Sequence, residues 1–365
     1  MFLVKEPSRD VAMELQQYDA LLVAGEGKDS YKVHHQHKAF LQIEGKCVIS
    51  YVIGALQEAK SVRSITITGP RDAILKHLDA DGINLVSPKP IHVLEQKQNL
   101  YENVWHSFLH TLPEEIPEKE LEDSPYRDQT VLVVPCDSPL ITSHEIDYFI
   151  LNSDLENFDL ITGLTPEKSL MTFYPEPGKP GVQMAYLHLK EHRYRINNLH
   201  LVKPIRIGNR HYVQNMYQYR YQRNFKNVVL FGWEIIGKDK KSRYRYYIGL
   251  LLGLFFSWMN VKPLVRFFRS WVPKQGLEEC ISNIMNTRFI GLESPLPGAA
   301  LDIDNAQDYE AIKLRLHDWQ AYMHRLSDLY PLPLTRRNTA PWTVKTAPRK
   351  SSSGISIPQV DARTT

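Results

Sequence analysis

The chain has 365 residues, a formal net charge of +3 at pH 7 and 43% hydrophobic residues. This composition is that of an ordinary globular protein, and it excludes a collagen-like, disulfide-rich or mainly disordered chain. The three cysteines are widely spaced and odd in number, which argues against a disulfide framework or a zinc cluster and favours a reducing, cytoplasmic location. The N-terminus lacks the long apolar core of a signal peptide, so we expect none.

The first informative stretch opens with an apolar run of strand length, residues 20–24, which is followed at once by Gly25 and Gly27. Glycines allow a sharp turn and a close approach of backbone N–H groups, so such a turn can hold phosphate oxygens. A polar loop then leads to Lys38, a movable positive charge, and to a predicted helix over residues 47–59. The pattern predicts a phosphate site at the carboxyl end of a strand.

Predicted strands and helices then alternate as far as residue 111. Such alternation implies a mostly parallel sheet with helices on both faces, which is an α/β architecture. Residues 113–128 carry seven acids against two bases, with three prolines, so we expect an exposed insertion there. The predicted strands are residues 64–68 and 83–86, and the predicted helices are residues 71–79 and 99–111.

A second informative stretch is the apolar run Val131–Cys136, which ends in Asp137-Ser138-Pro139-Leu140. Open α/β sheets place their chemistry at such strand ends, which makes Asp137 a candidate site residue. The alternative is that Asp137 only caps a turn or the helix that starts near Ser143. Further along, we expect strands over residues 159–163 and 184–189, with a loop rich in proline and glycine over residues 165–181.

Residues 203–245 carry eleven Lys/Arg against two acids, with tyrosines interleaved. This pattern is compatible with a nucleic acid, a phosphorylated acceptor, an anionic membrane or a plain solvated surface, and we expect no specific nucleic-acid partner. The run 248–259 is the most apolar in the chain, yet it is shorter than the roughly 18–20 residues that span a bilayer. We therefore expect residues 246–271 to form buried or interfacial helices, with peripheral membrane contact as one option.

The third informative stretch is Ala300–Ile303, predicted as a short strand, followed by a helix that Asn305 caps. Asp304 either serves the site or only favours the helix N-terminus electrostatically. Because the ends of parallel strands meet at one sheet edge, Asp304 and Asp137 would come close together and need a cation as partner. Asp302 competes with Asp304 for this role, because side chains two apart on a strand share a face.

The first stretch resembles the opening of the MobA-like NTP transferases, which are nucleotidyltransferases of the glycosyltransferase-A-like fold. That family reads roughly L-A-x-G-x-G/S-x-R, then K-A-L, then G-K/R-P. Residues 22–29, 38–40 and 45–47 match these three parts in turn. Two positions depart from the pattern, since Asp29 stands where arginine is usual and Cys47 where proline is frequent.

Three later stretches are similar to the same family, so that the resemblance covers residues 19–312. It implies a three-layer α/β sandwich with a mostly parallel sheet, like that of the nucleotide-diphospho-sugar transferases, and a helical insertion over about residues 240–290. We expect one domain over residues 1–330 and a disordered tail over residues 331–365. The similar stretches are Asp137–Leu140, residues 196–204, read as a strand beside the acceptor site, and residues 300–312.

The resemblance implies transfer of an NMP group from an NTP to a phosphorylated small-molecule acceptor, with release of pyrophosphate. The implied cofactor is Mg²⁺, held by Asp137 and Asp304, while Lys38 and Asp137 are the implied catalytic residues. Helix capping by Asn99 and a strand-edge position for Asn198 are the alternative explanations of those two residues. The implied nucleotide-binding residues are Ala24, Gly25, Gly27, Lys28, Lys38 and Asn99, and the implied acceptor contact is Asn198.

Two other functions are compatible with the sequence. A glycosyltransferase of the same broad fold would also use Asp137 and a metal but would take a sugar nucleotide. That family usually shows Asp-x-Asp at the strand end, where this chain has Asp137-Ser138-Pro139. A non-catalytic nucleotide-binding or scaffold protein is suggested by Asp29 in the arginine position.

Overall fold

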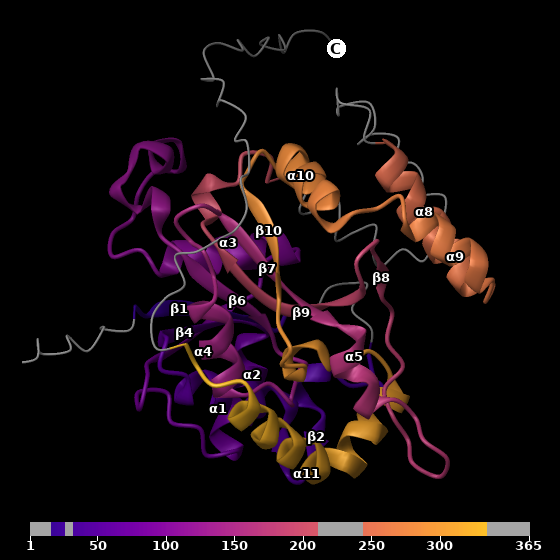
Figure 1. Ribbon diagram of the computed structural model, residues 1–365. Helices are drawn as coiled ribbons and strands as arrows, with labels where there is room; N and C mark the ends of the chain where they lie inside the picture. Colours follow the sequence, from indigo (N-terminus) through magenta and orange to yellow (C-terminus); the bar gives the residue numbers. More distant parts are fainter. Residues whose placement is uncertain (1–15, 26–31, 211–243, 334–365) are drawn as a thin grey trace, which may run out of the picture.

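The computed structural model describes residues 16–25, 32–210 and 244–333, which form a three-layer α/β sandwich (Figure 1). An eight-stranded sheet lies in the middle, and its main path runs β10-β7-β9-β6-β1-β4-β5, with β8 paired to β9. The strands of this sheet are β1 (Tyr18–Val23), β4 (Val62–Gly69), β5 (Ile91–Glu95), β6 (Val131–Pro135), β7 (Leu160–Pro166), β8 (Leu187–His188), β9 (Arg193–Val202) and β10 (Phe289–Glu293). A separate small hairpin pairs β2 (Gln42–Ile43) with β3 (Lys46–Cys47).

The sheet is mostly parallel, as predicted, with one inserted antiparallel strand. Strand β1 pairs in parallel with β4 and β6, β4 with β5, and β7 with β10. Strand β9 runs antiparallel between β6 and β7. The carboxyl ends of β1, β6 and β7 therefore share one edge of the sheet with the beginning of β9, and this edge carries the candidate site.

Helices cover both faces of the sheet because the strand side chains alternate between two apolar cores. On β1, Leu22 faces a core shared with α1 (Val48–Glu58), α2 (Arg71–Ala80) and α4 (Ser143–Leu151). Its neighbour Leu21 faces the opposite core, shared with α3 (Leu100–His110) and α10 (Lys274–Met285). The remaining helices are α5 (Glu167–Leu170), α8 (Tyr244–Trp258), α9 (Lys262–Arg269) and the long α11 (Ala306–Leu329).

Two predicted strands, residues 83–86 and 300–303, are wrong. In both cases a different apolar run pairs with the neighbouring strand of the sheet. Residues 83–86 are not a strand; pairing with β4 begins only at Ile91, after Pro88 and Pro90, which lack the N–H that a ladder needs. Residues 300–303 join no ladder among the described strands, because Leu301 and Ile303 instead bury against α11. The strand at the β7 end of the sheet is β10, which the sequence analysis missed.

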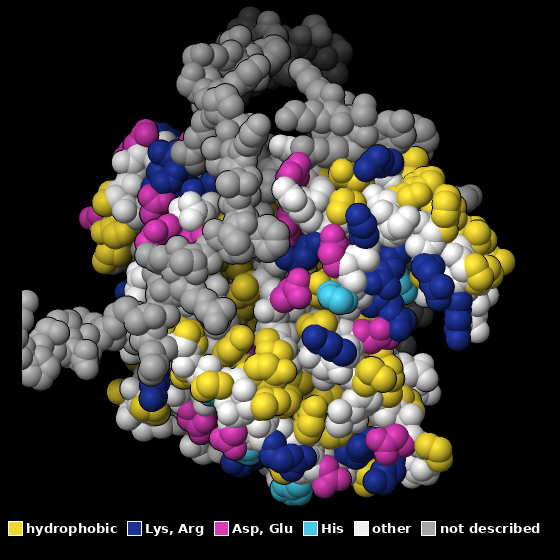
Figure 2. Space-filling model, in the orientation of Figure 1, with side chains coloured by type: hydrophobic (Ala, Val, Ile, Leu, Met, Phe, Trp, Pro, Cys, Tyr) yellow, Lys and Arg dark blue, Asp and Glu magenta, His cyan; other side chains and the backbone are white. Residues whose placement is uncertain are grey.

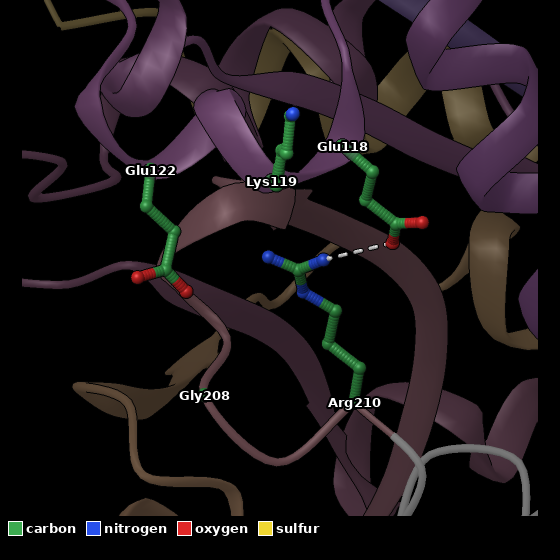
Figure 3. A pocket seen from close by; sticks show the side chains of 5 residues that line it. All are labelled: Glu118, Lys119, Glu122, Gly208 and Arg210. Carbon is green, nitrogen blue, oxygen red and sulfur yellow. Dashed lines mark ion pairs between the residues drawn. The ribbon is translucent and has the colours of Figure 1, made fainter. Parts of the chain in front are cut away.

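The acidic insertion is largely exposed, as predicted, and it is also folded. Residues 118–123 and 125–128 form two 3-10 helices, and Leu121 between the acids is fully buried. Asp128 holds Arg206 through two hydrogen bonds of 2.6 Å each. Figure 3 shows a second contact of the insertion, where Arg210 lies 3.7 Å from Glu118 across a pocket of about 360 Å³. None of the predicted site residues lines this pocket.

The apolar run near residue 250 forms the helix α8 and not a membrane span. Asn260 adopts a left-handed φ of 58° after α8, and Pro263 lies in the first turn of α9, so the run is split into two helices. Among the described residues, no helix is long and apolar enough to cross a membrane. Together α8, α9 and α10 make up the helical segment predicted over about residues 240–290. The tail from residue 334 lies outside the described residues.

Candidate active site

The shared edge of the sheet brings together five charged residues from four parts of the chain, which we call the charged cluster. Lys38 begins the 3-10 helix η1 (Lys38–Phe40), and Asp137 directly follows Cys136 after β6. Arg195 lies near the beginning of β9, while Asp302 and Asp304 lie on the connection that leads into α11. The cluster forms because the sheet topology places these distant segments side by side.

Lys38 links the two carboxylates that the sequence analysis paired. Its Nζ lies 3.5 Å from Asp137 Oδ2 and 3.3 Å from Asp304 Oδ1. Burial lowers the pKa of Lys38, but the nearby charges of Asp137, Asp304 and Asp302 outweigh burial and raise it above its ordinary value. Lys38 therefore stays protonated and carries a positive charge near neutral pH. The structure brings Lys38, Asp137 and Asp304 together as predicted, while their roles stay predictions.

Asp137 is held at the strand end with little contact to water. Its side chain is 18% exposed, and its backbone carbonyl accepts a hydrogen bond of 2.9 Å from Ile303 N. Burial raises the pKa of Asp137 to about 6, and the charges of Asp302 and Asp304 add to this rise while Lys38 opposes it. A carboxyl in this position gains stability as an anion from each cation placed beside it.

Arg195 is a member of the cluster that the sequence analysis missed. Its Nη2 donates to Asp302 Oδ1 at 2.5 Å and lies 3.5 Å from Asp304 Oδ2. Burial alone would raise the pKa of Asp302, but the Arg195 guanidinium reverses the effect and lowers it. Arg195 lies just before the predicted strand 196–204, three residues before Asn198, and a lone arginine there gave no signal of its role.

The pairing with Arg195 separates the two competing aspartates. The Asp302 side chain is 8% exposed and committed to Arg195, whereas the Asp304 side chain is 52% exposed at the mouth of the cluster. Asp304 N donates at 3.3 Å to Asp308 Oδ2, and Asn305 caps α11 as predicted by accepting from Asp308 N at 3.0 Å. Asp304 is therefore the aspartate of the pair that remains accessible to a ligand.

Asn198 supports the connection that carries Asp302 and Asp304. Its side-chain Nδ2 donates to Ala299 O at 3.1 Å, and its backbone adopts a left-handed φ of 50°. The β7–β9 register shifts beside it, between Thr162 and Leu164, so β9 is bulged at this point. The predicted acceptor contact of Asn198 stays a prediction, while its contact to Ala299 gives it a supporting role in the described conformation.

The buried carboxyl group of Glu145, on α4, holds the connection that carries Asp302 and Asp304. Thr142 caps α4 and places Glu145 in its first turn. Glu145 Oε2 accepts a hydrogen bond of 3.0 Å from Ala299 N, while Oε1 has no partner among the described residues. Burial raises the pKa of Glu145 to about 8, although hydrogen bonds from the Ala299 and Gly298 backbone oppose the rise. At neutral pH this carboxyl is mainly protonated.

The glycine turn after β1 begins as predicted, but only its first part is described. Ala24 is buried and its N–H donates to Thr68 O at 2.8 Å, so this amide extends the β1–β4 ladder. A Cβ on Gly25 would lie 2.5 Å from Asn103 Nδ2, so a larger residue here would have to displace the buried Asn103 side chain. Gly27 and Lys28, together with Asp29, lie outside the described residues.

Asn99 caps α3, which is the alternative explanation considered for it. Its Oδ1 accepts from Glu102 N at 2.9 Å, and its Nδ2 donates to Glu102 Oε1 at 2.7 Å. One helical turn later, Asn103 Oδ1 accepts from Lys97 N at 2.6 Å, beside Gly25. A nucleotide contact of Asn99 stays a prediction, and Asn103 is the helix residue that lies against the glycine turn.

The cluster offers two carboxylates as possible Mg²⁺ ligands, and the remaining ligands would have to come from elsewhere. Asp137 and Asp304 supply carboxylate oxygens, which are the ligands that Mg²⁺ prefers, and both already surround one cation, the Lys38 ammonium. No group of three or more His, Cys, Asp or Glu side chains in the described part of the chain is arranged to hold a metal ion. Two carboxylates fit the usual pattern in which nucleotide phosphates and waters complete the coordination of Mg²⁺.

The profile of the MobA-like NTP transferase domain matches residues 20–176. The matched region contains Gly25, Lys38, Asn99 and Asp137, whereas Arg195, Asp302 and Asp304 lie beyond it. The match confirms the resemblance and the enzyme class that the sequence analysis predicted. No curated protein sequence matches the chain.

Solved structures of low sequence identity align over most of the chain. A structure titled as a hypothetical transferase from Thermus thermophilus is 16% identical, covers 80% of this chain and 99% of its own, and has a TM-score of 0.48. CMP:2-keto-3-deoxy-manno-octonic acid synthetase complexed with CTP and 4-diphosphocytidyl-2C-methyl-D-erythritol synthase from Anaerococcus prevotii are each 10% identical. Each covers 83% of this chain and 99% of its own, with a TM-score of 0.40.

We expect Glu145→Gln to weaken the pH dependence of stability. The pKa of Glu145 is raised to about 8 in the folded protein from an ordinary value of 4.5. Between these values the folded state keeps a proton that the unfolded state loses, so this group makes wild-type stability fall as pH rises. The neutral variant lacks this loss, and its stability relative to the wild type should rise by on the order of a few kcal/mol from about pH 5 to about pH 8.

Urea unfolding of both proteins across this range measures the effect. Glu156→Gln, in the exposed turn after α4, is the matched control and should follow the wild-type pH profile. A Glu145→Gln protein whose stability differs from the wild type by the same amount at every pH would contradict the prediction.

Proposed function

We propose that this chain, which carries a MobA-like NTP transferase domain over residues 20–176, moves an NMP group from an NTP to a phosphorylated small-molecule acceptor. The observation that supports the proposal best is the position of Lys38 between Asp137 and Asp304, at the sheet edge where β1 leads into Gly25. This edge combines a backbone turn suited to phosphates, a protonated amine and carboxylates suited to a divalent cation.

The reaction would be an in-line displacement at the α-phosphorus. An acceptor phosphate oxygen forms a new bond to this phosphorus, the bond to the bridging oxygen of the β-phosphate breaks, and pyrophosphate leaves with the electron pair. A phosphate acceptor is already ionised near neutral pH, so no general base is required. Lys38 would stabilise the negative charge that builds up on the phosphoryl oxygens in the transition state.

Asp137 and Asp304 would hold Mg²⁺, and Asp302 would not. Asp302 is buried against Arg195, whereas Asp304 is half-exposed and Asp137 lies within contact of the same amine as Asp304. When bound, Mg²⁺ would supply charge neutralisation at the α-phosphate. Arg195 would act as a positioning residue. Its Nε donates to Ala300 O at 2.8 Å and its Nη2 donates to Asp302 Oδ1, and these two contacts hold the connection that bears Asp304.

The remaining predicted residues complete the binding site in this proposal. Gly25, Gly27 and Lys28 would contact the phosphates beyond the α-phosphate, with Ala24 at the base of the turn. Asn99 would lie near the nucleotide base, and Asn198 beside the acceptor. A cytoplasmic location is part of the proposal, because three widely spaced cysteines, odd in number, are typical of a protein from a reducing compartment.

A screen of the common NTPs against sugar phosphates, polyol phosphates and molybdopterin, with and without Mg²⁺, tests the function. We expect pyrophosphate release that depends on one NTP, one acceptor class and the metal. If no acceptor leads to pyrophosphate release, and a separate assay shows that the protein consumes a sugar nucleotide, the proposal would be replaced by a glycosyltransferase. Binding of NTP and Mg²⁺ without any turnover would replace it by a non-catalytic nucleotide-binding protein.

We expect Lys38→Ala to lower kcat by about 10²–10³-fold, or about 3–4 kcal/mol, because a charge aimed at the transition state in a water-poor site is lost. The folded fraction should stay high, which thermal unfolding checks. Lys76→Ala, on the exposed side of α2, is the matched control and should keep wild-type turnover. A folded Lys38→Ala protein with near-normal kcat would rule out the catalytic role.

The three aspartates of the cluster should respond differently to replacement by asparagine. Asp137→Asn should abolish Mg²⁺-dependent turnover, and Asp304→Asn should raise the Mg²⁺ concentration needed for half-maximal rate. Asp302→Asn should mainly lower the free energy of unfolding, on the order of 3 kcal/mol, since it leaves the Arg195 charge buried without its carboxylate. Rates over a Mg²⁺ titration and urea unfolding separate these effects. A changed Mg²⁺ requirement in Asp302→Asn, but not in Asp304→Asn, would reverse the assignment.

A further inference from the structure

Helices α8 and α9 form a two-helix arm, residues 244–273, that projects from the side of the sandwich (Figure 1). The arm has its own apolar interior, in which Phe256 stacks on Phe268 at 5.4 Å and Phe268 meets Trp271 edge-on at 5.1 Å. Val272, which is fully buried, joins the arm to the core formed with Leu189 and Tyr194. The arm is therefore packed against the body and is not a loose extension.

The arm exposes part of four large apolar side chains. Phe267 is 55% exposed, Met259 is 50% exposed, and Phe255 and Leu264 are each 38% exposed. Figure 2 shows hydrophobic side chains gathered over α8 and α9 with lysine and arginine side chains beside them. Four large apolar residues exposed within one short segment are unusual for a soluble surface, and such patches mark interaction sites.

The positive charge of the arm indicates that its binding partner is negatively charged. Residues 244–273 contain four Lys/Arg and no acidic residue. Lys262 and Arg266 are exposed one helical turn apart on α9, next to Leu264 and Phe267. Arg269 instead fixes the arm to the β8–β9 turn, where its Nη2 donates to Glu191 O at 2.9 Å and its Nε donates to Leu189 O.

We propose that this arm docks the protein on the surface of an anionic lipid bilayer. The exposed apolar side chains would enter the boundary between headgroups and acyl chains, while Lys262 and Arg266 contact the headgroup charges. A helical surface that projects outward suits a flat membrane, whereas peptide ligands are usually taken up in a groove. The membrane is met from one side, since α8 is too short to cross it.

Docking would also fix the orientation of the candidate active site. Arg269 holds the arm to the turn that leads into β9, and β9 carries both Arg195 and Asn198. The arm and the charged cluster are thus attached to the same strand. The proposal is independent of the chemistry at the cluster, because it depends only on residues of the arm.

Co-sedimentation of the full chain with lipid vesicles tests the proposal. We expect binding to vesicles of phosphatidylcholine with phosphatidylserine, little binding to phosphatidylcholine alone, and weaker binding at high salt because screening reduces the charge attraction. The double variant Lys262→Glu and Arg266→Glu should bind at least about 25-fold more weakly, at about fivefold for each charge. The double variant Leu264→Ser and Phe267→Ser should lose about tenfold or more.

Matched controls use the same changes on other exposed helices. Lys168→Glu on α5 and Leu314→Ser on α11, where Leu314 is 71% exposed, should bind vesicles like the wild type. Circular dichroism and thermal unfolding show whether each variant is folded. Failure of the wild type to bind anionic vesicles at low salt would overturn the proposal, as would arm variants that bind like the wild type. Self-association of the wild type that the apolar variant abolishes, without vesicle binding, would instead make the arm an interface between copies.

Discussion

The carboxylates of Asp137, Asp302 and Asp304 lie close together at one edge of the sheet. Their mutual repulsion is unfavourable, so each must be compensated by a neighbouring cation. Asp302 is compensated by Arg195 in a buried ion pair, while Asp137 and Asp304 share the Lys38 amine. The two compensations differ in kind, because Arg195 is fixed on a central strand whereas Lys38 follows the loop after the glycine turn. The two sets of contacts meet at Asp304, which lies within 3.3 Å of Lys38 Nζ and 3.5 Å of Arg195 Nη2.

The connection that carries Asp302 and Asp304 is not part of the ladder, and side chains from both sides hold it instead. Arg195 and Asn198 donate to Ala300 O and Ala299 O from β9, while Glu145 accepts from Ala299 N from the first turn of α4. Each of these contacts satisfies a backbone group that a strand would have paired with its neighbour. The connection is thus held at the backbone of Ala299 and Ala300, while Asp302 and Asp304 reach the sheet edge.

The inserted antiparallel strand β9 connects the two regions of interest in the molecule. It separates β6 from β7, and so it separates Asp137 from the ends of the strands beyond it. Its beginning carries Arg195 and Asn198, and the turn before it receives Arg269 from the arm.

Features that depend on neighbours in sequence were determined by the sequence itself. The glycine turn, the apolar strand before Asp137 and the cap of α11 by Asn305 are local, because steric freedom and side-chain alternation act within a few residues. Only the tertiary structure decided that Arg195 neutralises Asp302, because 107 positions separate them and an ion pair has no sequence pattern. It also decided that residues 289–293, and not 300–303, form the strand that pairs with the outer side of β7. Apolar runs indicate burial, but which run joins a ladder depends on the backbone that lies beside it.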